Sequence, residues 1–281
     1  MSLQFIFGNS GSGKSHWLYQ SIIEDSIKHP EKNYLVLVPE QFTMQTQKDL
    51  CLMHPRGGIM NIDVLSFGRL AHRVFEEVGR DSLPVLDDEG KNLVLRKIAG
   101  NFEDELTVLK GNLKKQGYIS EVKSVISEFT QYGVDLERID GFMEGLDQNS
   151  YLYYKLKDIR RLYEGFEDYL SEKYITKEEM LDVLSDVVPQ SEILKDSVVA
   201  MDGFTGFTPV QDRLLGELLR VCGRVMITVE MDEREDPFVY RHPYQLFALS
   251  KQMVTSLVKI ALETGAEVEE PVCLYGEPPY R

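Results

Sequence analysis

The chain has 281 residues, of which 43% are hydrophobic and 27% charged, and this ordinary globular composition excludes a fibrous or wholly disordered protein. Its 46 acidic and 31 basic side chains give a formal net charge of -15, which argues against non-specific nucleic-acid binding over the whole surface. Three scattered cysteines without a CxxC pair predict neither a disulfide framework nor a zinc knuckle, and they indicate a reduced, cytoplasmic protein. No apolar run approaches the roughly 18 residues of a membrane span, and the N-terminus has no signal-peptide pattern.

The first 82 residues alternate short apolar runs with helical patterns. The apolar runs cover Leu3–Phe7, Tyr34–Val38 and Asn61–Leu65, and helical spacing marks Lys14–His29 and Ser66–Val78. Continuous apolar strands between helices are typical of a parallel sheet that is covered on both faces. The sequence therefore predicts an α/β fold that begins at the N-terminus.

Residues 83–192 have a different pattern, with helical spacing throughout and no convincing strand. The predicted helices are Asp87–Ile98, Ile119–Tyr132, Leu136–Leu146, Tyr153–Lys173 and Thr176–Val187. This segment carries 23 acidic and 14 basic side chains, whereas residues 1–82 carry 9 and 8. We expect an acidic, all-helical insertion, and a nearly neutral first segment that could accept phosphate groups.

The α/β pattern resumes after the insertion. Val198–Met201 and Val225–Val229 are predicted strands, and Thr208–Val221 is a predicted helix with a Thr-Pro start. We therefore expect one core built from residues 1–82 plus 193–235.

The last part of the chain, residues 236–281, is expected to begin a following region. A helix is predicted at 245–264 and a strand at 267–274. Because the C-terminal residues have no stable-looking end, we expect the chain to be a piece of a longer polypeptide.

A glycine-rich segment between the first predicted strand and helix fits GxxxxGK[ST]. Its residues are Gly8, Asn9, Ser10, Gly11, Ser12, Gly13, Lys14 and Ser15. In a phosphate-binding loop of this kind, backbone N–H groups and a helix N-terminus face the phosphate oxygens. Lys14 would reach the β- and γ-phosphates of ATP, and the Ser15 hydroxyl would ligate Mg²⁺. The alternative is a Gly/Ser-rich turn that binds no ligand.

Asp202, at the end of the predicted strand Val198–Met201, is the candidate for the second Mg²⁺ ligand. The alternative is an ordinary aspartate at a strand end. The next residue is Gly203. Helicases that hydrolyse ATP at a phosphate-binding loop carry a glutamate at this position, and that glutamate activates the attacking water. We therefore assign no catalytic residue and expect hydrolysis to be slow or absent.

Several segments together resemble the N-terminal part of AddB, the helicase-nuclease subunit of bacterial AddAB recombination enzymes. DGFTGFTPVQ, from Asp202 to Gln211, resembles superfamily 1 helicase motif II, although its Glu, Gln and Asp have become Gly203, Thr205 and Gly206. IDVLSFGRLA, from Ile62 to Ala71, resembles motif Ib, and LVLVPEQFT, which begins at Leu35, lies where motif Ia belongs. The resemblance covers essentially the whole chain.

The resemblance implies a RecA-like, superfamily 1 helicase-like core with a helical insertion. It implies an AddA-like motor subunit as partner in a heterodimer. It also implies a C-terminal nuclease domain with an iron–sulfur cluster, which this chain does not contain. The family is thought to read the Chi recombination signal in the emerging single strand of DNA.

The family's DNA-reading positions that match this sequence are Gln41, Thr43 and Arg69. Relatives can carry Trp at the position of His72, so His72 is a departure that could change the signal that is read. The residue types suit the task, because Gln and Arg offer hydrogen bonds to base edges and Phe204 or Phe207 could stack on a base. The alternative for each is a surface or capping role.

Two other functions remain open at this stage. The first is a working P-loop enzyme, either an ATPase or a small-molecule kinase; the only paired arginines for a kinase lid are Arg160 and Arg161, in the insertion. The second is a purely structural fragment of a larger subunit.

Overall fold

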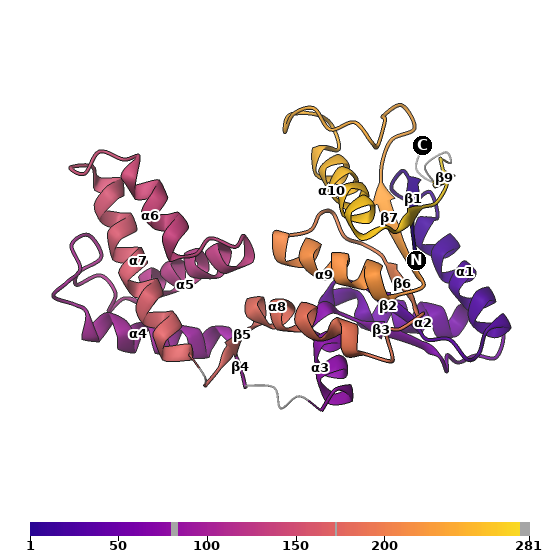
Figure 1. Cartoon of the computed structure of the whole chain (residues 1–281), viewed down its shortest axis with the longest axis horizontal. Helices are drawn as coiled ribbons and strands as arrows, with labels where there is room; N and C mark the ends of the chain where they lie inside the picture. The colour runs from indigo at the N-terminus through magenta and orange to yellow at the C-terminus, as the bar shows by residue number, and fades with distance from the viewer. Residues whose placement is uncertain (80–83, 172, 276–281) are drawn as a thin grey trace. The chain divides into compact units, whose positions relative to one another are not determined.

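The computed structural model describes residues 1–79, 84–171 and 173–275 (Figure 1). The chain divides into two compact units, one made of Met1–Arg80 and Leu181–Arg281 and the other of Asp81–Met180. Each unit has a buried apolar cluster of its own. Among the described residues, no helix is both long enough and apolar enough to cross a membrane.

The first unit is built on a seven-stranded sheet in which every described pairing is parallel. The strands are β1 (Ser2–Gly8), β2 (Tyr34–Leu37), β3 (Ile62–Leu65), β6 (Val198–Met201), β7 (Arg224–Glu230), β8 (Glu267–Val268) and β9 (Val272–Leu274). Their order is β3-β2-β6-β7-β1-β8, and β9 also pairs with β1. All residues of β2 and β6 are buried, as the continuous apolar runs predict.

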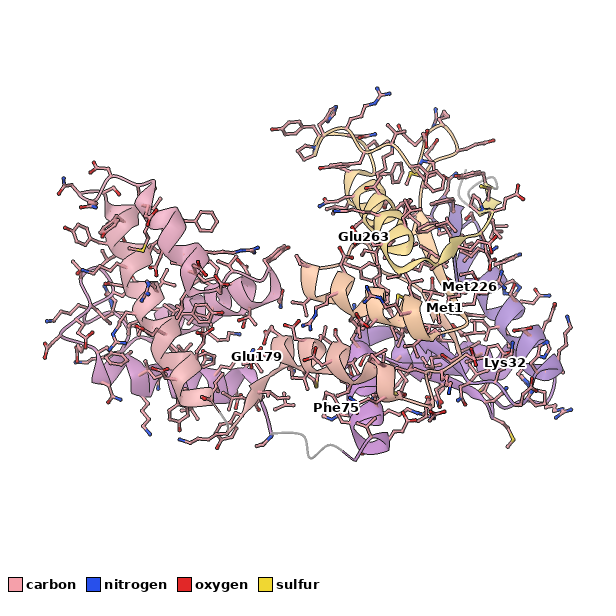
Figure 2. The ribbon with its side chains drawn as sticks, viewed as in Figure 1. Met1, Lys32, Phe75, Glu179, Met226 and Glu263 are labelled. Carbon is pink, nitrogen blue, oxygen red and sulfur yellow. The ribbon has the colours of Figure 1, made fainter. Side chains whose placement is uncertain are left out.

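Helices cover this sheet. Helices α1 (Lys14–Lys28) and α2 (Thr43–Met53) share a buried cluster with the strands, and α9 (Pro209–Val221) packs against α10 (Ala248–Thr264), as Figure 1 shows. The remaining helical segments are η1 (Glu40–Phe42), α3 (Phe67–Glu77), α8 (Lys177–Val187), which contains the boundary between the units, and η2 (Val188–Gln190). Phe75 of α3 and Met226 of β7, both labelled in Figure 2, are buried.

The parallel arrangement places one set of loops together. In a parallel sheet, the carboxyl ends of all strands lie at one edge. The loops that follow β1, β2, β3, β6 and β7 therefore open at the same edge of the first unit. Of the site residues predicted from the sequence, Gly8 ends β1, and five lie within the first two turns of α1, α2 or α3, namely Lys14, Ser15, Thr43, Arg69 and His72. The others lie in these connections.

The second unit is mainly helical. Its elements are β4 (Val85–Leu86), α4 (Asp88–Asn101), α5 (Gln116–Gln131), α6 (Leu136–Glu144), α7 (Tyr151–Leu170), β5 (Ile175–Thr176) and the start of α8. Its core includes Leu95, Ile126, Leu162 and Phe166. The buried carboxylate of Asp158 on α7 accepts hydrogen bonds of 2.7–3.0 Å from the backbone N–H groups of Thr107, Val108 and Leu109. It therefore fixes the long connection between α4 and α5.

The structure confirms the predicted α/β class with its parallel sheet, and it differs from the sequence-based prediction in several places. Strands β4 and β5 pair with each other inside the segment that was expected to be wholly helical. Two-residue strands are too short to produce a period-two pattern. Helix α2 was not predicted, because only Thr43, Thr46 and Leu50 of its residues are buried and the apolar periodicity is weak.

Two boundaries also differ. The insertion was expected to end at residue 192, whereas the second unit ends at Met180. Residues 236–281 were expected to begin a following region, but α10, β8 and β9 belong to the first unit and extend its sheet beside β1. The boundary expected between residues 82 and 83 lies outside the described residues.

Candidate functional site

The loop from Gly8 to Ser15 joins the buried strand β1 to α1. Gly11 and Gly13 have positive φ angles of 76° and 89°, which L side chains rarely adopt. Gly13 directly precedes α1, so the free N–H groups of the helix start follow the loop. This geometry suits an anion, because the first turn of a helix combines free N–H groups with partial positive charge.

Gly8 and Ser12 make the loop tight. A Cβ atom on Gly8 would collide with Ser12 Oγ and with the backbone oxygen of Leu274 on β9. Ser12 Oγ is itself buried and has no hydrogen-bond partner among the described residues. Because an unpaired buried hydroxyl costs free energy, it indicates a place where a polar ligand would supply the partner.

Lys14 lies across its own loop. Its Nζ donates hydrogen bonds of 3.0 Å to the backbone oxygen of Gly8 and 2.7 Å to that of Asn9. Burial lowers the pKa of Lys14 from its ordinary value, although the charges of Glu230 and Asp202 oppose the shift. An incoming phosphate would have to draw the ammonium group away from these two carbonyl groups.

Asp202 is buried behind the loop, with 7% of its surface exposed. Its Oδ2 accepts a hydrogen bond of 2.7 Å from the hydroxyl of Tyr19 on α1, and its Oδ1 accepts one of 2.6 Å from the hydroxyl of Thr228 on β7. Burial and the nearby carboxylate of Asp202 raise the pKa of Tyr19, which therefore stays a neutral donor. The hydroxyl oxygen of Tyr19 also lies 3.3 Å from the hydroxyl oxygen of Thr46.

The carboxylate of Asp202 therefore lacks the arrangement that a magnesium ligand needs. Mg²⁺ demands near-ideal octahedral geometry and loses its water reluctantly. Here each carboxylate oxygen of Asp202 already accepts a hydrogen bond from a hydroxyl group inside the core. Magnesium binding by Ser15 and Asp202 remains a prediction from the sequence, and the residues as they are arranged do not fit the ion. Among the described residues, no group of three or more His, Cys, Asp or Glu side chains could hold a metal.

Gly203 has a φ angle of 78°. A glutamate at this position would have to adopt the left-handed conformation, which costs an L residue about 1–2 kcal/mol. The backbone at this position is therefore adapted to glycine.

Phe204 and Phe207 pack against each other and against Phe67 at the start of α3. Their ring centroids are 5.4 Å apart, and they lie 5.3 Å and 6.4 Å from that of Phe67. Both are half-buried, so the cluster joins the loop after β6 to α3 and leaves part of each ring open.

The other predicted DNA-reading residues differ in exposure. Gln41, Arg69 and His72 are exposed, and the guanidinium of Arg69 lies 3.7 Å from the carboxylate of Glu40. This pair brings the turn after β2 next to α3. Thr43 is buried, and its hydroxyl donates a 3.0 Å hydrogen bond to the backbone oxygen of Glu40, so it stabilises the turn.

Three residues of this region were missed from the sequence. Phe42 is 48% exposed, and a Cβ atom on Gly203 would lie 3.9 Å from its ring, so Phe42 borders the loop after β6. Its place inside the PEQFT segment was the available signal. Tyr19 and Thr228 gave no signal, because a buried tyrosine on a helix and a threonine in a strand are ordinary core residues.

These features define a parallel α/β protein with a glycine-rich loop between its first strand and first helix. The sequence model of the family described as "ADDB, N-terminal" matches residues 5–281, and the chain belongs to this family.

Three curated relatives that resemble the chain carry the same name. The chain is 44% identical over 279 residues to the B subunit of the ATP-dependent helicase/deoxyribonuclease of Lachnoclostridium phytofermentans. It is 34% identical over 274 residues to the protein of the same name from Ruminiclostridium cellulolyticum, and 35% over 277 residues to that of Caldanaerobacter subterraneus. These matches cover 99%, 98% and 98% of the chain but only 24%, 24% and 23% of the relatives. The chain therefore spans about a quarter of their length.

Proposed function

We propose that this chain is a degenerate, RecA-like helicase core of the superfamily 1 type, which binds ATP without effective turnover and contributes to binding single-stranded DNA. The observation that carries the first part is the Gly8–Ser15 loop, with its buried, unpartnered Ser12 hydroxyl, beside Gly203 in a left-handed conformation. The first feature favours an anionic ligand, and the second removes the residue that would activate water. Family membership supports the helicase-like assignment.

The nucleotide site is tested by Lys14→Ala. Because Lys14 is the cation closest to the proposed phosphates, the substitution should weaken ATP binding at least about tenfold, or roughly 1.4 kcal/mol. Lys28→Ala is the matched control, since Lys28 is exposed in the last turn of the same helix. The ATP affinities of both variants are measured by calorimetric titration. Equal affinities for the two variants would contradict a nucleotide site at Lys14.

The DNA proposal concerns the edge formed by Gln41, Arg69 and His72, supported by the turn that Thr43 stabilises. Polar side chains there would read base edges, and a base could stack on Phe42 or on the open parts of Phe204 and Phe207. The name of the relatives includes the word deoxyribonuclease, which supports DNA as the ligand. We propose that this edge reads the Chi signal.

The measurement compares Arg69→Ala with Arg73→Ala. The guanidinium of Arg73, one turn along α3, lies 2.6 Å from the carboxylate of Asp63, whereas the acidic partner of Arg69 among the described residues is the exposed Glu40, at 3.7 Å. Arg69→Ala should cost about 1–3 kcal/mol on a guanine-containing signal and much less on unrelated strands. Equal losses on both DNAs would show that Arg69 contacts phosphate only.

We further propose that the chain works in the cytoplasm as part of a heterodimer, in which an AddA-like motor subunit supplies ATP-driven movement. The word "subunit" in the relatives' name supports a partner. The nuclease activity and its iron–sulfur cluster are proposed to lie in the part of the relatives that this chain does not cover.

An active kinase or ATPase has less support. Arg160 pairs with Asp140 and Arg161 with Glu105 and Glu164, and the guanidinium of Arg161 lies 3.7 Å from the centroid of the Phe102 ring. Both arginines therefore form ion pairs within the second unit, which gives the kinase hypothesis no support from a catalytic arginine pair.

A further inference from the structure

The contact between Tyr19 and Asp202 follows from helix geometry. Tyr19 is four residues after Ser15 on α1, so the two side chains lie on one face of the helix. Side chains on a helix lean towards its N-terminus, which directs the Tyr19 ring towards the loop. Its hydroxyl thus meets Asp202, 183 residues away in the sequence, at 2.7 Å in the buried core.

Thr228 completes the arrangement from the opposite side. It lies one strand away from Asp202, because β6 and β7 are neighbours, and its side chain is 4% exposed. The two hydroxyls give each carboxylate oxygen one donor. Hydrogen bonds to an ionised carboxylate are short and strong, so they supply much of the stabilisation that a bound cation would otherwise give.

We propose that Tyr19 and Thr228 replace the divalent cation at Asp202, so that this chain binds the nucleotide polyphosphate without requiring Mg²⁺. The inference rests on the proposed nucleotide site. The counter-charge for the phosphates comes from Lys14 and from the N–H groups at the start of α1, and the negative charges of Glu230 and Asp202 oppose it. The hydrogen bonds from Tyr19 and Thr228 stabilise the charge of Asp202 in place. The site therefore accepts the metal-free nucleotide about as well as the magnesium complex.

The decisive measurement uses the unaltered chain. ATP affinity is measured by calorimetry in excess Mg²⁺ and again in excess EDTA, and we expect the two dissociation constants to agree within about threefold, less than 1 kcal/mol. Thermal unfolding with and without ATP gives a second readout, and the increase in Tm should be the same in both buffers.

A double substitution, Tyr19→Phe with Thr228→Val, keeps the shapes of both side chains and removes both donors. Asp202 then lacks protein donors and favours a cation, so ATP should bind at least about tenfold more tightly in Mg²⁺ than in EDTA. Tyr34→Phe is the matched control, because the Tyr34 hydroxyl donates a 2.8 Å hydrogen bond to Asp25, a carboxylate at the other end of α1. It should behave as the unaltered chain does.

The outcomes separate the two proposals. Binding of ATP by the unaltered chain only in Mg²⁺ overturns this inference and leaves the nucleotide site intact. Binding in neither buffer overturns the nucleotide site and the inference with it. A folded double variant that stays indifferent to Mg²⁺ also overturns the inference, and if that variant does not fold, the two-buffer comparison on the unaltered chain still decides.

Discussion

At the scale of single residues, the backbone conformation of Gly203 bears directly on the proposed lack of ATP turnover. Gly203→Glu restores the carboxylate but forces glutamate to a φ angle of 78°. We expect no gain in ATP turnover and a loss of about 1–2 kcal/mol in the free energy of unfolding. Phosphate release and urea unfolding measure the two effects.

Gly206→Glu is the control for that substitution. Gly206 lies in the same loop, with no strained φ angle and open space where its Cβ would be. The same charge should cost little stability there. Sustained ATP hydrolysis by the Gly203→Glu variant would mean that the rest of the catalytic site is complete, contrary to the arrangement around Asp202.

The site could be predicted from the sequence only where its residues are neighbours along the chain. The Gly8–Ser15 spacing is a local pattern, and the structure shows the expected strand before it and helix after it. The contacts of Asp202 with Tyr19 and Thr228 join three distant segments, so no local spacing could predict them. Likewise, the burial of Thr43 depends on how the turn after β2 packs.

At the scale of secondary-structure elements, a buried ion pair joins α4 to the start of α8. Lys91 is 2% exposed, and its Nζ lies 2.6 Å from Glu178 and 3.3 Å from the hydroxyl of Ser127 on α5. Burial alone would raise the pKa of Glu178, but the hydrogen bond and charge of Lys91 outweigh it and hold that pKa below its usual value of 4.5. The pair therefore stabilises the folded state only while Glu178 is ionised.

The lowered pKa of Glu178 makes the free energy of unfolding of the second unit depend on pH. The contribution of Glu178 is fully present above its unfolded pKa and is lost as the pH falls through its lower folded pKa. Glu178→Gln should lower the free energy of unfolding of the second unit by about 3–5 kcal/mol at neutral pH, because the Lys91 charge stays buried. The deficit should shrink in acid, as denaturant titrations at several pH values would show; a deficit independent of pH would contradict the assignment.

The elements themselves were largely predictable where burial is continuous. The strand β6 was predicted with its observed bounds, because four buried residues form an unbroken apolar run before a polar one. Helix α2 escaped prediction because most of its residues face solvent and its buried side chains include two threonines. Strands β8 and β9 are short and depend on pairing with β1 rather than on their own composition.

At the scale of the whole molecule, each unit has its own buried apolar core. We therefore expect a substitution in one unit to destabilise that unit and not the other. Asp158→Asn removes the charge that three backbone N–H groups share, and it should cost the second unit at least about 2 kcal/mol. Hydrogen exchange should then accelerate across residues 84–171 and stay unchanged in the strands of the first unit.

Asp168→Asn is the control for this comparison, because Asp168 is an exposed residue of the same helix. It should leave exchange unaltered throughout. Equal acceleration in both units after Asp158→Asn would show that the chain unfolds as a single cooperative body.

The position of β1 in the sheet sets the order in which the chain can fold during synthesis. In the part of the chain that the structure describes, β1 pairs with β7, β8 and β9, all of which lie after residue 223. At about 5–20 residues per second, β1 waits on the order of 10–40 s for its first partner to leave the ribosome. The second unit is complete before then, so the nascent chain carries a folded helical unit and an unpaired, apolar β1, which is the stage at which chaperones would be needed most.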